Sequence, residues 1–123
     1  MYVPPELKLL QPGPGIAVVE VLGEHDLSTE DEAGGLFLRL VSENELVVID
    51  LTETAFVDSS FLAILMRART AAGEHGHRFL LQVERESNVG RTLAITRLLQ
   101  LFNHVSTREE ALNWIGPADA PAP

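Results

Sequence analysis

The chain has 123 residues, 46% of them hydrophobic, which suits a single domain with one hydrophobic core. Its formal net charge of −9 argues against binding to nucleic acid or to an anionic membrane surface, because proteins bind both through Lys and Arg. The acidic charge is instead consistent with a basic protein partner, or with a role in solubility alone. The chain has no cysteine, no signal-peptide pattern at its start and no apolar run near the roughly 20 residues that span a bilayer, so we expect a cytoplasmic protein without disulfides or thiolate chemistry.

The first part of the chain predicts a hairpin. Residues 1–6 carry two prolines and form a loose lead-in, and residues 7–10 suggest a short edge strand. The segment 11–15 is rich in proline and glycine and predicts a turn. Residues 16–22 are apolar except for one glutamate and predict the second strand of the hairpin.

A helix is expected next, from Ser28 or Thr29 as N-cap to about Ser42, with three acidic residues in its first turn. Its buried face should comprise Leu36, Phe37, Leu40 and Val41. Gly34 and Gly35 cost the helix roughly 1 kcal/mol each relative to alanine. We therefore expect them either to allow close helix packing or to distort the helix.

The middle of the chain predicts a strand, a helix and a second strand. Residues 46–51 form a continuous apolar run typical of a strand that is buried on both faces. Residues 61–74 are apolar with helical periodicity, and residues 79–83 resume as a buried strand. A helix of this length between two strands predicts a crossover that joins parallel neighbours.

Three polar residues, Asp58, Ser59 and Ser60, stand where this strand region ends and the helix begins. Each has a side chain that can accept a hydrogen bond from an amide of the first helical turn. The chemistry of the residues alone favours Ser59 as a plain N-cap, favours a cap role for Ser60 as well, and leaves open whether Asp58 caps the helix. A phosphate at this helix end would meet free amides and a favourable dipole.

The last third of the chain predicts a helix from Val89 or Gly90 to about Leu99 and a short strand within residues 101–105. Thr107 and Glu110 have the spacing of a capping box, which opens a last helix through Trp114 and Ile115. Residues 116–123 are rich in proline and alanine and are expected to form a disordered tail.

Three stretches give this chain a resemblance to the STAS domain, and more narrowly to the small single-domain bacterial anti-sigma factor antagonists. They are residues 19–27 (VEVLGEHDL), residues 47–51 with 56–60 (VVIDL and FVDSS), and residues 97–102 with 106–114. The resemblance implies an α/β fold over residues 7–115: a mixed, mostly parallel sheet of four to five strands with about four helices. The family usually has glycine where this chain has Phe61, and Gly-Leu where it has Arg97 and Leu98.

The resemblance also implies a function. In the family, the serine that Ser59 matches is phosphorylated by the anti-sigma factor, a serine kinase of the GHKL type, and a serine phosphatase reverses the reaction. The unphosphorylated protein captures the anti-sigma factor and so releases the sigma factor. The positions expected to bind the partner are Glu24, Asp26, Asp58, Ser60 and Phe61.

Two other function classes stay open: a STAS-like scaffold subunit of a signalling or lipid-transport ABC assembly that is not phosphorylated, and a small-molecule or nucleotide sensor. We expect no enzyme, because His25, Asp26 and Ser59 lack the G-x-S-x-G setting of a hydrolase nucleophile. His75 and His77 lack a third ligand, so we expect a solvated turn and neither metal nor cofactor. The sequence leaves the choice between monomer and homodimer open.

Overall fold

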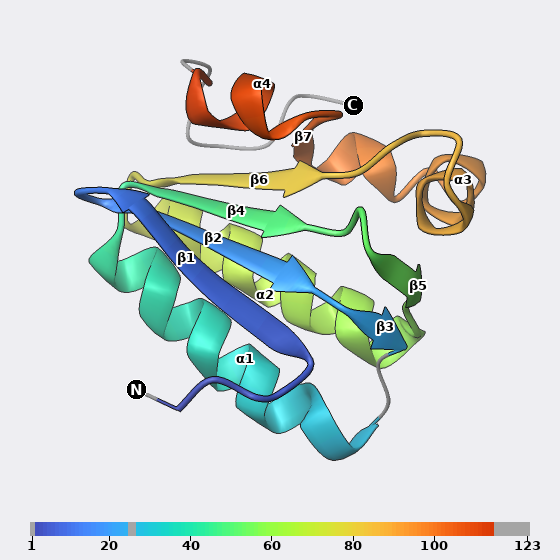
Figure 1. Ribbon diagram of the computed structural model, residues 1–123, viewed down its shortest axis with the longest axis horizontal. Coiled ribbons are helices and arrows are strands. Elements are labelled where there is room, and N and C mark those ends of the chain that lie inside the picture. The colour runs from blue at the N-terminus through green and yellow to red at the C-terminus, as the bar shows by residue number, and fades with distance from the viewer. Residues whose placement is uncertain (1, 25–26, 115–123) are drawn as a thin grey trace.

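The fold is a mixed sheet with helices on both faces (Figure 1). The computed structural model describes residues 2–24 and 27–114, without the side chains of residues 24 and 27–30. Its strands are β1 (Leu7–Gly13), β2 (Ile16–Val21), β3 (Gly23–Glu24), β4 (Leu46–Asp50), β5 (Thr54–Phe56), β6 (Arg78–Gln82) and β7 (Asn103–Val105). Its helices are α1 (Leu27–Glu43), α2 (Ser59–Glu74), α3 (Asn88–Ile95) and α4 (Arg108–Leu112), with a 3₁₀ turn, η1 (Leu99–Leu101).

The main sheet has five strands in the order β1-β2-β4-β6-β7. β1 pairs with β2 in an antiparallel hairpin, and all other neighbours in this sheet are parallel. All five residues of β4 are buried, because the strand lies in the middle of the sheet and has helices over both faces. The predicted hairpin, the predicted crossover and the predicted α/β fold class are confirmed.

Helices α1 and α2 cover one face of the sheet and α4 covers the other (Figure 1). The larger core lies under α1 and α2, where the rings of Phe37 and Phe61 meet edge to face with centroids 6.0 Å apart. A β-carbon on Gly34 would lie 3.6 Å from the side chain of Ile64, so this glycine sits at the close contact of α1 with α2. Gly35 faces open space.

Several predicted boundaries differ from the structure. Helix α1 begins at Leu27, so Ser28 and Thr29 lie inside it and neither is its N-cap. Strand β1 continues to Gly13, because Gly13 still pairs with Ile16 beyond a register shift. The last helix begins at the predicted capping box of Thr107 but ends at Leu112, before Trp114. Residue 115 and the predicted tail lie outside the described residues.

The third predicted helix is shorter than expected and is followed by a turn. Helix α3 ends at Ile95, and Arg97 has a φ of 64°. This left-handed backbone favours glycine, because a β-carbon crowds the following carbonyl oxygen. The chain therefore turns at Arg97 into η1, and Leu99 rather than Leu98 is buried there.

Candidate functional site

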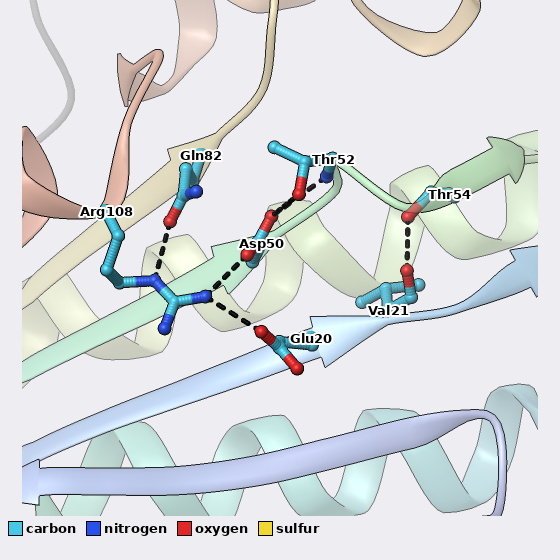
Figure 2. A network of polar contacts seen from close by, with 7 residues as sticks. All are labelled: Glu20, Val21, Asp50, Thr52, Thr54, Gln82 and Arg108. Carbon is cyan, nitrogen blue, oxygen red and sulfur yellow. Dashed lines mark hydrogen bonds and ion pairs between the residues drawn. The ribbon is translucent and has the colours of Figure 1, made fainter.

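A short side ladder positions the segment that precedes α2. β3 and β5 pair in parallel beyond the carboxyl ends of β2 and β4, and the backbone of Glu24 lies opposite Phe56. The buried hydroxyl of Thr54 donates a hydrogen bond of 2.7 Å to the carbonyl of Val21, which anchors β5 to the end of β2 (Figure 2). The ladder therefore fixes the chain two residues before Asp58.

The first turn of α2 is closed by Asp58 and not by a serine. Asp58 has an extended backbone with a φ of −97°, and its Oδ1 accepts a hydrogen bond of 2.8 Å from the N–H of Phe61. Ser59 and Ser60 are the first two residues of the helix itself. The interpretation of Ser59 or Ser60 as the N-cap is thus wrong, and the cap role that was left open for Asp58 is confirmed.

The serine side chains have different surroundings. Ser59 is exposed to solvent. Ser60 is half-buried and lines a groove of about 330 Å³ between α1 and α2, which also contains Asp31 and Arg67. Of the two hydroxyls, that of Ser59 is the more accessible to a partner protein.

Phe61 is a core residue. Its side chain has no exposed area, and it packs against Phe37 on the inner side of α1. The expectation that Phe61 contacts a partner is corrected, since a side chain that points into the core at this position cannot be an exposed anchor. Helix α2 presents Phe61 to the core because Ile64, Leu65 and Ala68 follow it on the same buried face.

An exposed aromatic ring lies close in the chain to the first turn of α2, which contains Ser59 and Ser60. Phe56 is 55% exposed, although it is a large apolar residue at the end of β5. It borders a hollow of about 260 Å³ whose other side is formed by Asn88, Val89 and Thr92 of α3. An exposed aromatic ring at the rim of a hollow is typical of a surface that binds another protein.

The structure brings most of the predicted site residues to one end of the molecule. Asp58, Ser59 and Ser60 share the first turn of α2, and the backbone of Glu24 reaches the same place through its pairing with Phe56. The side chain of Glu24 and the whole of Asp26 lie outside the described part of the structure.

Sequence reasoning missed a polar network on the face of the sheet opposite α2. The guanidinium of Arg108 donates to Asp50 Oδ2 at 2.6 Å, to Glu20 Oε2 at 3.1 Å and to Gln82 Oε1 at 2.9 Å (Figure 2). Glu20, Asp50 and Gln82 occupy one row across β2, β4 and β6. Polar residues at or near the end of three adjacent apolar strands were the signal in the sequence.

Asp50 is 4% exposed, so its carboxylate has its hydrogen-bond partners in this network rather than in solvent. Its Oδ1 also accepts hydrogen bonds from the backbone and the hydroxyl of Thr52, at 2.9 and 2.7 Å. Burial by itself lowers the pKa of Arg108, but the hydrogen bonds and charges of Asp50 and Glu20 outweigh burial and raise that pKa. The network joins α4 to the sheet, and its polar side chains serve as hydrogen-bond partners for one another.

The described residues hold no group of three or more His, Asp or Glu that could bind a metal ion. The rings of His75 and His77 stack with centroids 5.6 Å apart. Nδ1 of His77 donates to the carbonyl of Val41 at 2.8 Å, which attaches the link after α2 to the end of α1. Among residues 2–24 and 27–114, no helix combines the length and the apolar character needed to cross a bilayer.

The chain is similar to known proteins over most of its length. The family model described as "STAS domain" matches residues 10–111. An anti-sigma factor antagonist from Mycobacterium paratuberculosis is 25% identical, with a TM-score of 0.72 over 91% of this chain and 96% of that one. A STAS domain protein from Planctomyces limnophilus, described as an anti-sigma-factor antagonist, is 22% identical, with a TM-score of 0.68 over 86% and 94%.

A third similar structure is the Bacillus cell fate determinant SpoIIAA in its phosphorylated form. It is 16% identical, with a TM-score of 0.70 over 87% of this chain and 96% of that one. At this identity, the likeness concerns the fold.

Proposed function

The chain belongs to the STAS domain family and has the fold of its anti-sigma factor antagonists, and from this premise we propose that it binds an anti-sigma factor serine kinase and is released when that kinase phosphorylates Ser59. The binding surface includes Asp58, Ser59 and Ser60, together with the neighbouring positions Glu24 and Asp26. A serine phosphatase restores binding. Capture of the anti-sigma factor frees a sigma factor and thereby regulates transcription.

The observation that carries this proposal is the division of roles between Asp58 and Ser59. Asp58 accepts the hydrogen bond from the first turn of α2, so the exposed hydroxyl of Ser59 is not needed to cap the helix. Ser59 can therefore be modified without loss of the cap. A hydroxyl that capped the helix would be less accessible, and its modification would disturb the fold.

The site also supports a charge-based switch. Phosphorylation adds about −1.5 to −2 charges at neutral pH. Helix α2 has no acidic residue in its first turn, so its positive end favours a phosphate there. The fold should therefore tolerate phospho-Ser59, whereas a partner packed against Asp58 and Ser59 would meet a second anion at the centre of the interface.

The surface around Ser59 has other properties of a protein interface. Phe56 offers an exposed ring on one side of the turn, and Ser60 opens into the groove between α1 and α2 on the other. The net charge of −9 favours encounter with a partner that presents basic residues.

The test is incubation with ATP and a candidate GHKL-type anti-sigma factor, followed by intact-mass measurement and peptide mapping. Wild-type protein should gain one phosphate on Ser59, and Ser59→Ala should gain none. Ser60→Ala is the matched control, because Ser60 is the adjacent serine of the same helix, and it should still be phosphorylated.

Binding is measured in parallel by calorimetry without ATP. Ser59→Ala should bind like wild type, and Ser59→Asp should bind at least about 100-fold more weakly, as expected for a charge placed at an interface centre. Equal binding by both variants would refute the switch and favour the scaffold function without phosphorylation. No binding by either variant or by wild type would refute the pairing with that kinase class.

A further inference from the structure

A third cavity lies at the edge of the sheet, and none of its lining residues belongs to the binding surface proposed around Ser59. It has a volume of about 310 Å³ and is lined by residues of the loop after β6, of α3, of η1 and of β7: Arg85, Ala94, Leu99, Gln100 and His104. Strands β6 and β7 are parallel, and Arg85 follows the carboxyl end of β6. Ligands of parallel sheets commonly bind beyond the carboxyl ends of the strands.

The lining of this cavity is cationic and polar, although the chain as a whole is strongly acidic. Arg85 forms no ion pair with any residue in the described part of the chain, and no carboxylate lines the cavity. The nearby Glu86 pairs instead with Arg91, at 3.6 Å. The guanidinium of Arg85 therefore keeps its donors for another acceptor.

His104 is the second ionisable group of the cavity. It is half-buried in β7, and its ring has no hydrogen-bond partner among the described residues. Burial, and then the positive charge of Arg85, lower the pKa of His104. Arg85 thus brings a fixed positive charge to the cavity, while His104 is neutral at neutral pH; an anion there would interact favourably with the guanidinium and could accept a hydrogen bond from a ring N–H of His104.

We propose that this cavity binds a small organic oxyanion, with Arg85 as the main anchor of its carboxylate or phosphate group. A guanidinium donates two parallel hydrogen bonds to either group. The amide of Gln100 and a ring N–H of His104 can supply further donors, while Ala94 and Leu99 contact an apolar body.

The size of the cavity also favours an organic ligand. About 310 Å³ is near the lower end of the roughly 300–1,000 Å³ of small-molecule sites. The cavity is larger than a bare phosphate ion requires, and two of its five lining residues are apolar. Both this cavity and the start of α2 lie toward the carboxyl ends of the parallel strands, so a ligand here could influence the partner surface proposed above.

The test is a titration followed by NMR, using butyrate, n-butyl phosphate and inorganic phosphate as probes and sodium chloride at matched ionic strength as reference. Wild-type protein should show saturable shifts at Arg85, Gln100 and His104 with at least one butyl probe. The tighter of the two butyl probes identifies the head group. The pKa of His104, read from its ring signals, should rise when that probe saturates the site.

Arg85→Gln should weaken binding at least about tenfold, because a charged hydrogen-bond donor is lost. Arg39→Gln is the matched control: it removes the same charge from an exposed side chain of α1 outside the cavity, and it should bind like wild type. Shifts that do not saturate, that sodium chloride reproduces, or that persist unchanged in Arg85→Gln would overturn the site. None of these outcomes bears on Ser59, so the two proposals stand or fall separately.

Discussion

Asp58 Oδ1 and the backbone N–H of Phe61 form a hydrogen bond of 2.8 Å that closes the first turn of α2. Two residues of this turn lie in opposite environments: Phe61 points into the core, whereas Ser59 lies at the surface. One carboxylate thus stabilises the helix and leaves the adjacent hydroxyl available for chemistry.

Replacing Asp58 should therefore destabilise the fold through the cap. We expect Asp58→Ala to lower the free energy of unfolding by about 1 kcal/mol, measured by urea denaturation. Asp58→Asn keeps a side-chain oxygen that can accept the bond, and it should lose only a few tenths of that amount. Equal losses in the two variants would mean that the charge of Asp58, and not its hydrogen bond, stabilises α2.

The left-handed backbone of Arg97 leads to a stabilising substitution. With a φ of 64°, Arg97 occupies a region that costs a residue with a β-carbon about 1–2 kcal/mol. Arg97→Gly should raise the free energy of unfolding by roughly 0.5–1 kcal/mol after the greater chain entropy of glycine is counted. Arg97→Ala is the control, because it removes the charge but keeps the β-carbon. A gain in Arg97→Ala as large as in Arg97→Gly would assign the effect to charge.

The sequence could predict the elements whose burial is continuous or periodic. The apolar run of residues 46–50 identified β4, because a strand covered on both faces has no polar position. The capping box at Thr107 located the start of α4, because its two reciprocal hydrogen bonds involve residues close in the chain. The start of α2 could be located for the same reason. However, Asp58, Ser59 and Ser60 can each accept the capping hydrogen bond, and the sequence alone does not show that Asp58 is the one that does.

Features that depend on contacts between distant segments could not be predicted. Arg108 reaches Glu20, 88 residues earlier, and that pairing exists only once the strands are in register. The need for Gly90 depends on a closer contact that also forms only in the fold: a β-carbon there would lie 2.0 Å from the carbonyl oxygen of Glu84, so only glycine fits against the preceding loop. By contrast, Gly35 has open space around it, although both glycines lie within helices.

Replacing Arg108 should destabilise the fold, because it leaves the buried carboxylate of Asp50 without its cation. Asp50 is 6% exposed in its side chain and Arg108 is 30% exposed, so the pair is only partly screened. We expect Arg108→Ala to lower the free energy of unfolding by about 2–3 kcal/mol, less than the roughly 3–5 kcal/mol of a fully buried pair. Urea denaturation at pH 7 measures the change.

Two comparisons test this assignment. Arg39→Ala breaks the exposed pair of Arg39 with Glu43 on α1, and it should cost no more than about 0.5 kcal/mol. The double variant Asp50→Asn/Arg108→Ala should lose less stability than the sum of its single variants, because it removes the buried carboxylate of Asp50 together with the cation that pairs with it. Additive losses would show that Arg108 stabilises α4 by packing alone.

His104 makes stability depend on pH in a defined direction. Burial and then the charge of Arg85 lower its pKa in the folded protein below the ordinary value of 6.5. Above pH 6.5 the imidazole is neutral in both states, and its full contribution to stability is present. As the pH falls through 6.5, the unfolded chain takes up a proton that the folded protein resists. The free energy of unfolding therefore decreases until the lower, folded pKa is passed.

We expect His104→Gln to reduce the loss of stability between pH 7 and pH 5, since glutamine cannot take up the proton. The measurement is urea denaturation of both proteins at half-unit pH steps. Arg85→Gln removes the second cause of the shift, so the pKa of His104 in that variant, followed by NMR, should move up toward its ordinary value. If His104→Gln kept the whole pH dependence of the wild type, the dependence would have to arise from other groups, and the lowered pKa of His104 would not be its cause.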